Sequence, residues 1–74
     1  MENRVSILQA AGFKHKGLEN GKRKWAEGNW ETAKTNLLAN GYTEQAGKAV
    51  KDNAKRTVTV SFDGSFLFVE VIKK

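Results

Sequence analysis

The chain has 74 residues and a formal net charge of +5 at neutral pH, from 13 lysines and arginines against 8 acidic residues. A chain of this length buries only about 60% of its unfolded surface, so we expect one domain over residues 1–74 with a small core. The absence of cysteine excludes disulfides, thiolate metal sites and a cysteine nucleophile, and it favours a reducing, cytoplasmic compartment. No segment approaches the roughly 20 apolar residues of a membrane span, so we expect no membrane partner.

A short helix over residues 2–11 is the first predicted element. Val5, Leu8 and Ala11 recur on one helical face. Gly12 follows them and suits the left-handed position at which many helices end. The chain is predicted to become extended directly after this glycine.

The next segment predicts a hairpin that concentrates positive charge beside aromatic residues. Residues 19–21 favour a three-residue loop with Gly21 in the left-handed position, which pairs Leu18 with Lys22. In this register four lysines share one face: Lys14, Lys16, Lys22 and Lys24. The other face carries rings: Phe13, His15 and Trp25. A two-residue loop at residues 20–21 is the alternative, and it fits less well because it mixes lysines with a tryptophan on one face.

A second helix is predicted after Asn29, whose side chain can cap it, and it is expected to end at residues 40–41. Its apolar stripe consists of Trp30, Ala33, Leu37 and Leu38. Residues 43–55 leave two alternatives open, a third helix that begins after Thr43 or a long loop. The helix is weakened by Gly47, which costs about 1 kcal/mol relative to alanine.

From Arg56 onward, strict alternation predicts a second hairpin with a two-residue turn at residues 63–64. The face expected to form the core consists of Val58, Val60, Phe62, Leu67, Val69 and Val71. The other face consists of Thr57, Thr59, Ser61, Phe66, Phe68 and Glu70. Together the elements predict a small α+β fold, with two or three short helices packed on an antiparallel sheet built from the N-terminal basic hairpin and the C-terminal hairpin.

The residues that carry most enzyme chemistry are missing or isolated in this sequence. His15 is the only histidine, and no motif places a serine beside it. Residues 17–22 depart from a P-loop because three residues, not four, separate the two glycines. The acidic residues are scattered, which disfavours a metal site. We therefore expect no enzyme, no cofactor, no metal and no small-molecule substrate, and we interpret His15 as a neighbour of Trp25.

The lysine-rich hairpin face is the strongest candidate for binding. Lysines that alternate along a strand lie about 7 Å apart, which suits successive phosphates, although edge lysines also protect strands from aggregation. The predicted contacts to nucleic acid or to an acidic protein surface are Lys14, Lys16, Lys22, Arg23, Lys24, Lys48, Lys51, Lys55 and Arg56. The sequence thus predicts a small non-catalytic regulator that docks on nucleic acid or on a nucleoprotein machine of transcription or defence.

A protein-directed inhibitor or modulator is the alternative, with the lysines steering it onto an acidic surface and Trp25, Phe66 or Phe68 as hydrophobic anchors. In two-layer domains, however, a helix more often covers such a strand face, and the two phenylalanines would then be buried and not act as anchors. In size and lack of cysteine the chain is similar to small phage-encoded proteins that act on host RNA polymerase or on CRISPR effectors. As a minor variant, the element order over residues 29–72 resembles a winged-helix DNA-binding domain, with residues 43–55 as the recognition helix.

Overall fold

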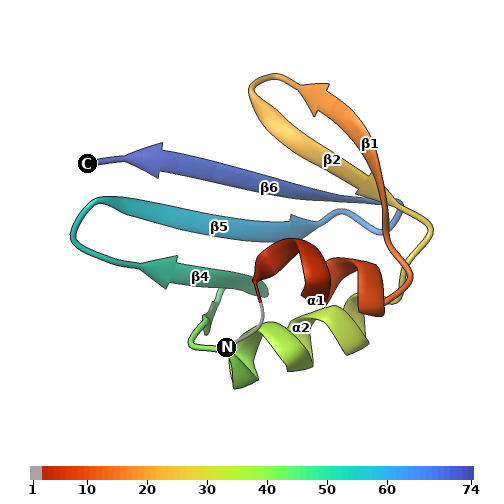
Figure 1. The fold of residues 1–74 in the computed structure, drawn as a ribbon, viewed down its shortest axis with the longest axis horizontal. Coiled ribbons are helices and arrows are strands. Elements are labelled where there is room, and N and C mark those ends of the chain that lie inside the picture. The colour runs from red at the N-terminus through yellow and green to blue at the C-terminus, as the bar shows by residue number, and fades with distance from the viewer. Residues whose placement is uncertain (1–2) are drawn as a thin grey trace.

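The structure is a computed structural model and describes residues 3–74. Within this range two helices and six strands follow one another (Figure 1): α1 (Arg4–Ala10), β1 (Lys14–Glu19), β2 (Lys22–Ala26), α2 (Trp30–Ala39), β3 (Thr43–Gln45), β4 (Lys48–Asp52), β5 (Arg56–Phe62) and β6 (Phe66–Lys73). The strands form one antiparallel sheet in the order β1-β2-β6-β5-β4-β3. The predicted α+β class is confirmed.

Both helices begin at an asparagine whose side chain caps the first turn. Asn3 Oδ1 accepts the Ser6 N–H at 2.8 Å, and Asn29 Oδ1 accepts the Thr32 N–H at 3.0 Å. Each contact satisfies one backbone donor that has no partner inside the helix. The predicted start of the second helix is therefore confirmed.

The apolar face predicted for α1 is partly wrong. Ile7 and Leu8 are fully buried, whereas Val5 is 44% exposed. The helix therefore packs through Ile7, Leu8 and Ala11, because this face buries the larger apolar surface against the rest of the protein. Arg4 shares that face, since it precedes these residues by three, four and seven positions.

One buried cluster combines residues of both helices with residues of the sheet: Ile7, Leu8, Ala11, Phe13, Trp25, Ala33, Leu37, Tyr42, Ala49, Val58, Val60, Leu67 and Val69. Its strand members share one face, because Val60 pairs with both Ala49 and Val69, and Trp25 pairs with Leu67. Both helices lie on this side of the sheet (Figure 1). We call it the helix side, and the opposite surface the open face.

The turn predicted for the N-terminal hairpin is wrong. Asn20 and Gly21 form a two-residue turn with φ angles of 53° and 77°, so Glu19 pairs with Lys22. Two successive left-handed residues match the twist of the flanking strands, and Asn-Gly adopts this conformation readily. The predicted alternative, the two-residue loop, is the one observed.

A β-bulge in the same hairpin restores part of the predicted register. Gly17 pairs with Lys24 and His15 pairs with Trp25, so Lys16 is an extra residue on β1. The φ angle of Gly17 is 112°, a conformation that side chains rarely allow. The register places Lys14, Lys22 and Lys24 on the face opposite Trp25, as predicted, while Lys16 occupies the bulge.

Residues 43–55 form neither a third helix nor a long loop. They form the β3–β4 hairpin, with a two-residue turn at Ala46 and Gly47 whose φ angles are 52° and 80°. The hairpin extends the sheet beyond β5 and buries Ala49 completely, which stabilises this pairing over the weakly amphipathic helix. The winged-helix variant is therefore wrong, because its recognition helix is absent from this segment.

The turn of the C-terminal hairpin lies one residue later than predicted. The Asp63 N–H donates to the Phe66 carbonyl, which places Gly64 and Ser65 at the turn. Asp63 Oδ1 accepts the N–H groups of Ser65 and Phe66, each at 2.8 Å. The predicted alternation is unchanged, because Phe62 pairs with Leu67 instead of Ser65, and a shift of two residues preserves it. Val71, which was expected in the core, is 39% exposed near the end of β6.

These turn contacts predict a pH-dependent contribution to stability. The Phe66 N–H, followed by the Ser65 N–H, holds the pKa of Asp63 below its ordinary value of 3.8. The carboxylate therefore stabilises the fold above that value, and the stabilisation is lost as the pH falls through the lower pKa of the folded state. We expect Asp63→Asn, which keeps a side-chain oxygen, to reduce the acid-induced fall in the free energy of unfolding, measured by urea unfolding below and above pH 3.8.

Some acid sensitivity should remain in Asp63→Asn. The pKa of Asp52 is also lowered, first by its contact with Lys74 and then by the hydroxyl of Thr57. An unchanged acid dependence in Asp63→Asn would contradict the role assigned to the Asp63 turn.

Candidate anion-binding surfaces

Three of the four hairpin lysines lie near carboxylates of this chain. The Nζ atoms of Lys14 and Lys16 lie 3.8 Å and 3.4 Å from Glu27 Oε2. Lys24 Nζ lies 3.6 Å from Glu19 Oε1 and 4.0 Å from the centroid of the Phe66 ring. Such exposed pairs add little stability, but each carboxylate offsets positive potential that a partner would otherwise meet.

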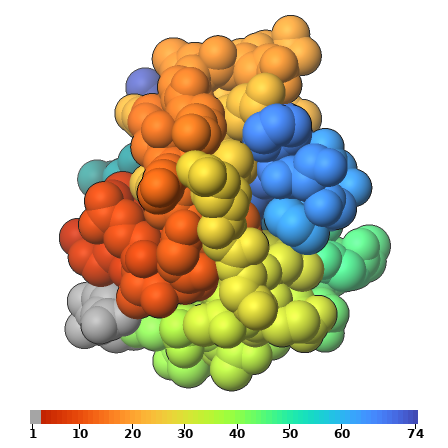
Figure 2. Space-filling model, turned by 90° about the vertical axis from the view of Figure 1, so that its right-hand side faces the viewer, coloured from red at the N-terminus to blue at the C-terminus, as the bar shows by residue number. Residues whose placement is uncertain are grey.

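The position of Glu27 follows from tight packing after β2. Figure 2 shows this segment, in yellow, between the α1–β1 connection and the β5–β6 turn. A Cβ atom on Gly28 would lie 2.3 Å from atoms of the Phe13 ring, so only glycine fits there. Glu27 itself has a φ of 70°, and its carboxylate reaches both Lys14 and Lys16.

Four other cations lie on the helix side: Arg4, Arg23, Lys51 and Arg56. Arg23 pairs with the buried Val69, and Lys51 pairs with the buried Val58. Arg56 lies two residues before Val58 on β5 and so shares its face. Within residues 3–74, none of the four forms an ion pair. We call them the helix-side basic surface.

Two cavities adjoin on this surface, and Arg4 lines both. The first has a volume of about 410 Å³ and is lined by Arg4, Val5, Gln9, His15, Arg23 and Trp25. The second has a volume of about 310 Å³ and is lined by Asn3, Arg4, Asn40, Tyr42, Lys51, Asn53, Arg56 and Val58. No carboxylate of the described chain lines either cavity. A concave surface with charge of one sign focuses its field on a ligand of opposite charge.

Arg4 was missed by the sequence analysis, although a signal was present. The residue belongs to the packing face of α1, so its side chain lies over the sheet instead of in solvent around the helix. The periodicity of Arg4 with Ile7, Leu8 and Ala11 could have indicated this position. Asn3, the cap of the same helix, was also missed.

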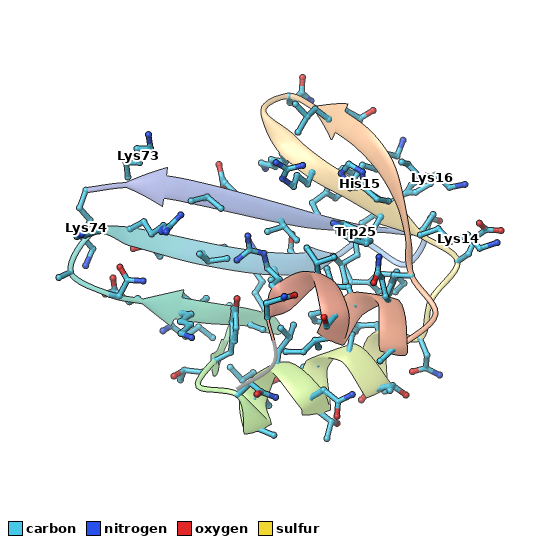
Figure 3. The ribbon with its side chains drawn as sticks, viewed as in Figure 1. Lys14, His15, Lys16, Trp25, Lys73 and Lys74 are labelled. Carbon is cyan, nitrogen blue, oxygen red and sulfur yellow. The ribbon has the colours of Figure 1, made fainter. Side chains whose placement is uncertain are left out.

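The prediction that Trp25 is a hydrophobic anchor for a partner is wrong, because its side chain is 3% exposed and belongs to the core. Figure 3 shows it between the β1–β2 hairpin and the helices, while Lys14 and Lys16 project from β1 on the side away from His15. The predicted contact of His15 with Trp25 is confirmed, with ring centroids 4.9 Å apart. The indole Nε1 is buried without a hydrogen-bond partner in the described chain.

The other predicted site residues are dispersed. Lys22 is half-buried on the open face, Lys48 is exposed at the start of β4, and Lys55 is exposed in the β4–β5 turn. Phe66 and Phe68 are half-buried on the open face, where no helix of the described chain covers them. The structure thus places Lys51 and Arg56 from the predicted set at one cavity and Arg23 at the other, and Arg4 lines both.

The described residues 3–74 contain no group of three or more metal-ligating side chains. Neither helix in this range has the length and apolar character needed to cross a membrane. No protein family model, curated protein or solved structure matches the chain.

Proposed function

We propose that this protein is a small non-catalytic regulator that docks on nucleic acid, free or within a nucleoprotein machine, through the helix-side basic surface. The observation that carries this proposal is the convergence of Arg4, Arg23, Lys51 and Arg56 around two cavities with no carboxylate lining in the described chain. These four cations, which form no ion pair within residues 3–74, repel one another, so their clustering favours an anionic partner. As part of this proposal, the protein acts in the cytoplasm, the location expected from its lack of cysteine.

The spacing and identity of these cations suit a phosphate backbone. Strands β2 and β4, which carry Arg23 and Lys51, lie three strand spacings apart, about 14 Å across the sheet. One strand of a duplex places about four phosphates over that length. Three of the four cations are arginines, whose planar donors bind phosphate oxygens in pairs. Lys22, Lys48 and Lys55 would add weaker, more distant attraction.

Oligonucleotide binding as a function of salt tests the proposal. Fluorescence anisotropy with labelled 5′-hydroxyl strands, single and duplex, should show binding at about 50 mM salt that weakens steeply as salt rises. Four phosphate contacts predict a slope of about −3 to −4 in a plot of log affinity against log salt. The absence of binding to every oligonucleotide at this low salt would contradict the proposal.

A second candidate function, a protein-directed inhibitor or modulator, is favoured by the open face. There the half-buried rings of Phe66 and Phe68 lie among charges of both signs, including Lys24 and Glu19. Apolar rings with a mixed polar rim are typical of protein interfaces. Binding to purified RNA polymerase or to a purified CRISPR effector, lost in Phe66→Ser/Phe68→Ser but not in Arg4→Gln/Arg56→Gln, would support this candidate, and the reverse ranking would contradict it.

A further inference from the structure

The second cavity offers hydrogen-bond donors from its asparagines. Asn3 Oδ1 already accepts the Ser6 N–H at 2.8 Å. Asn53 Oδ1 accepts the N–H groups of Lys55 and Arg56, both at 2.9 Å. Within the described residues, these contacts leave the Nδ2 groups of Asn3 and Asn53 for a ligand, and these groups only donate. The third asparagine of the cavity, Asn40, donates its Nδ2 group to the Asn36 carbonyl at 2.8 Å.

The charged residues of the cavity also only donate. Arg4, Lys51 and Arg56 supply guanidinium and ammonium groups, which have no acceptor. Lys51 Nζ lies 5.6 Å from the centroid of the Tyr42 ring. Asp52, which lies between Lys51 and Asn53 in the sequence, contacts Thr57 and Lys74, and the alternation of β4 places it on the open face. A cation would therefore find no complementary charge among Arg4, Lys51 and Arg56.

We propose that this cavity binds a phosphate monoester, such as the terminal phosphate of a nucleic acid strand. This inference rests on the proposed function, because the cavity is part of the helix-side basic surface. A monoester carries a charge of about −1.5 to −2 and three acceptor oxygens, whereas a backbone diester carries a single charge. The three cations Arg4, Lys51 and Arg56, together with the amide groups of Asn3 and Asn53, match the charge and acceptors of a monoester better than those of a diester. The volume of about 310 Å³ leaves space for the attached sugar.

Matched oligonucleotides test the inference directly. We expect a single strand with a 5′-phosphate or a 3′-phosphate to bind at least about tenfold more tightly than the same strand with hydroxyl ends, since charge-assisted hydrogen bonds are about twice as strong as neutral ones. Adenosine monophosphate and inorganic phosphate, added separately as competitors, distinguish a nucleotide-bound phosphate from a free one. Displacement by either supports a monoester site, and displacement by neither contradicts it.

Asn53→Asp is the decisive variant. Aspartate keeps an oxygen that accepts the Lys55 and Arg56 N–H groups, so the turn should persist, but it replaces the amide donor by a negative charge. We expect this variant to lose the preference for phosphorylated strands. The matched control is Asn29→Asp, which makes the same change at the cap of α2, outside both cavities. Thermal unfolding of both variants establishes that they fold.

The outcomes separate this inference from the proposed function. Equal binding of phosphorylated and hydroxyl strands overturns the monoester site and leaves the nucleic-acid proposal standing. Binding of adenosine monophosphate or inorganic phosphate without binding of any oligonucleotide supports the site and overturns the nucleic-acid proposal. A preference for phosphate that survives in Asn53→Asp overturns the assignment to this cavity.

Discussion

Replacing Trp25 by alanine is expected to lower the free energy of unfolding by about 3–5 kcal/mol. The side chain is 3% exposed, its strand position pairs with Leu67, and its ring contacts that of His15, so removal leaves a cavity in a small core. A chain of this length has a total stability of about 4–11 kcal/mol, so much of it would be lost. Urea unfolding followed by circular dichroism measures the change.

Two control variants identify the cause of this loss. Trp25→Phe should retain most of the stability, because the indole N–H has no hydrogen-bond partner in the described chain and its removal sacrifices no bond. Leu18→Ala, at a side chain that is 70% exposed, should have an effect within about 0.5 kcal/mol. A similarly small effect for Trp25→Ala would contradict the place of Trp25 in the core and would favour its predicted role as a hydrophobic anchor for a partner.

The triple variant Arg4→Gln/Lys51→Gln/Arg56→Gln is expected to weaken oligonucleotide binding on the order of 100-fold at about 0.1 M salt. Each of these side chains lines the second cavity and is unpaired within the described residues. Each phosphate contact adds about −0.9 to the slope of log affinity against log salt. We therefore expect this slope to become shallower, from about −3.6 to about −0.9. Anisotropy titrations across a series of salt concentrations measure both quantities.

The matched control is Lys14→Gln/Lys16→Gln/Lys22→Gln, which removes the same number of charges from the β1–β2 hairpin. Two of these lysines already contact Glu27, so we expect a much smaller loss of affinity. An equal loss in both variants would show that binding follows net charge alone. A larger loss in the control would indicate that the hairpin lysines form the binding site.

The comparison of the two basic surfaces explains where sequence reasoning about charge succeeds and fails. The sequence pattern located the hairpin lysines, but it could not show that the carboxylate of Glu27, eleven or more residues away from both Lys14 and Lys16, lies 3.8 Å and 3.4 Å from their Nζ atoms. The helix-side basic surface draws on α1, β2, β4 and β5, and no single segment of the sequence contains it. Arg4 is separated from Lys51 by most of the chain.

The net positive charge, the Asn29 cap and the alternating faces of the C-terminal hairpin could be derived from the amino-acid sequence without the fold. These features depend on composition or on residues a few positions apart, so local chemistry suffices. The packing face of α1, the β3–β4 hairpin and the bulge at Lys16 could not be derived in this way, because each depends on burial and pairing against distant residues. The same long-range contacts decided which cations are offset by carboxylates and which remain available to an anionic partner.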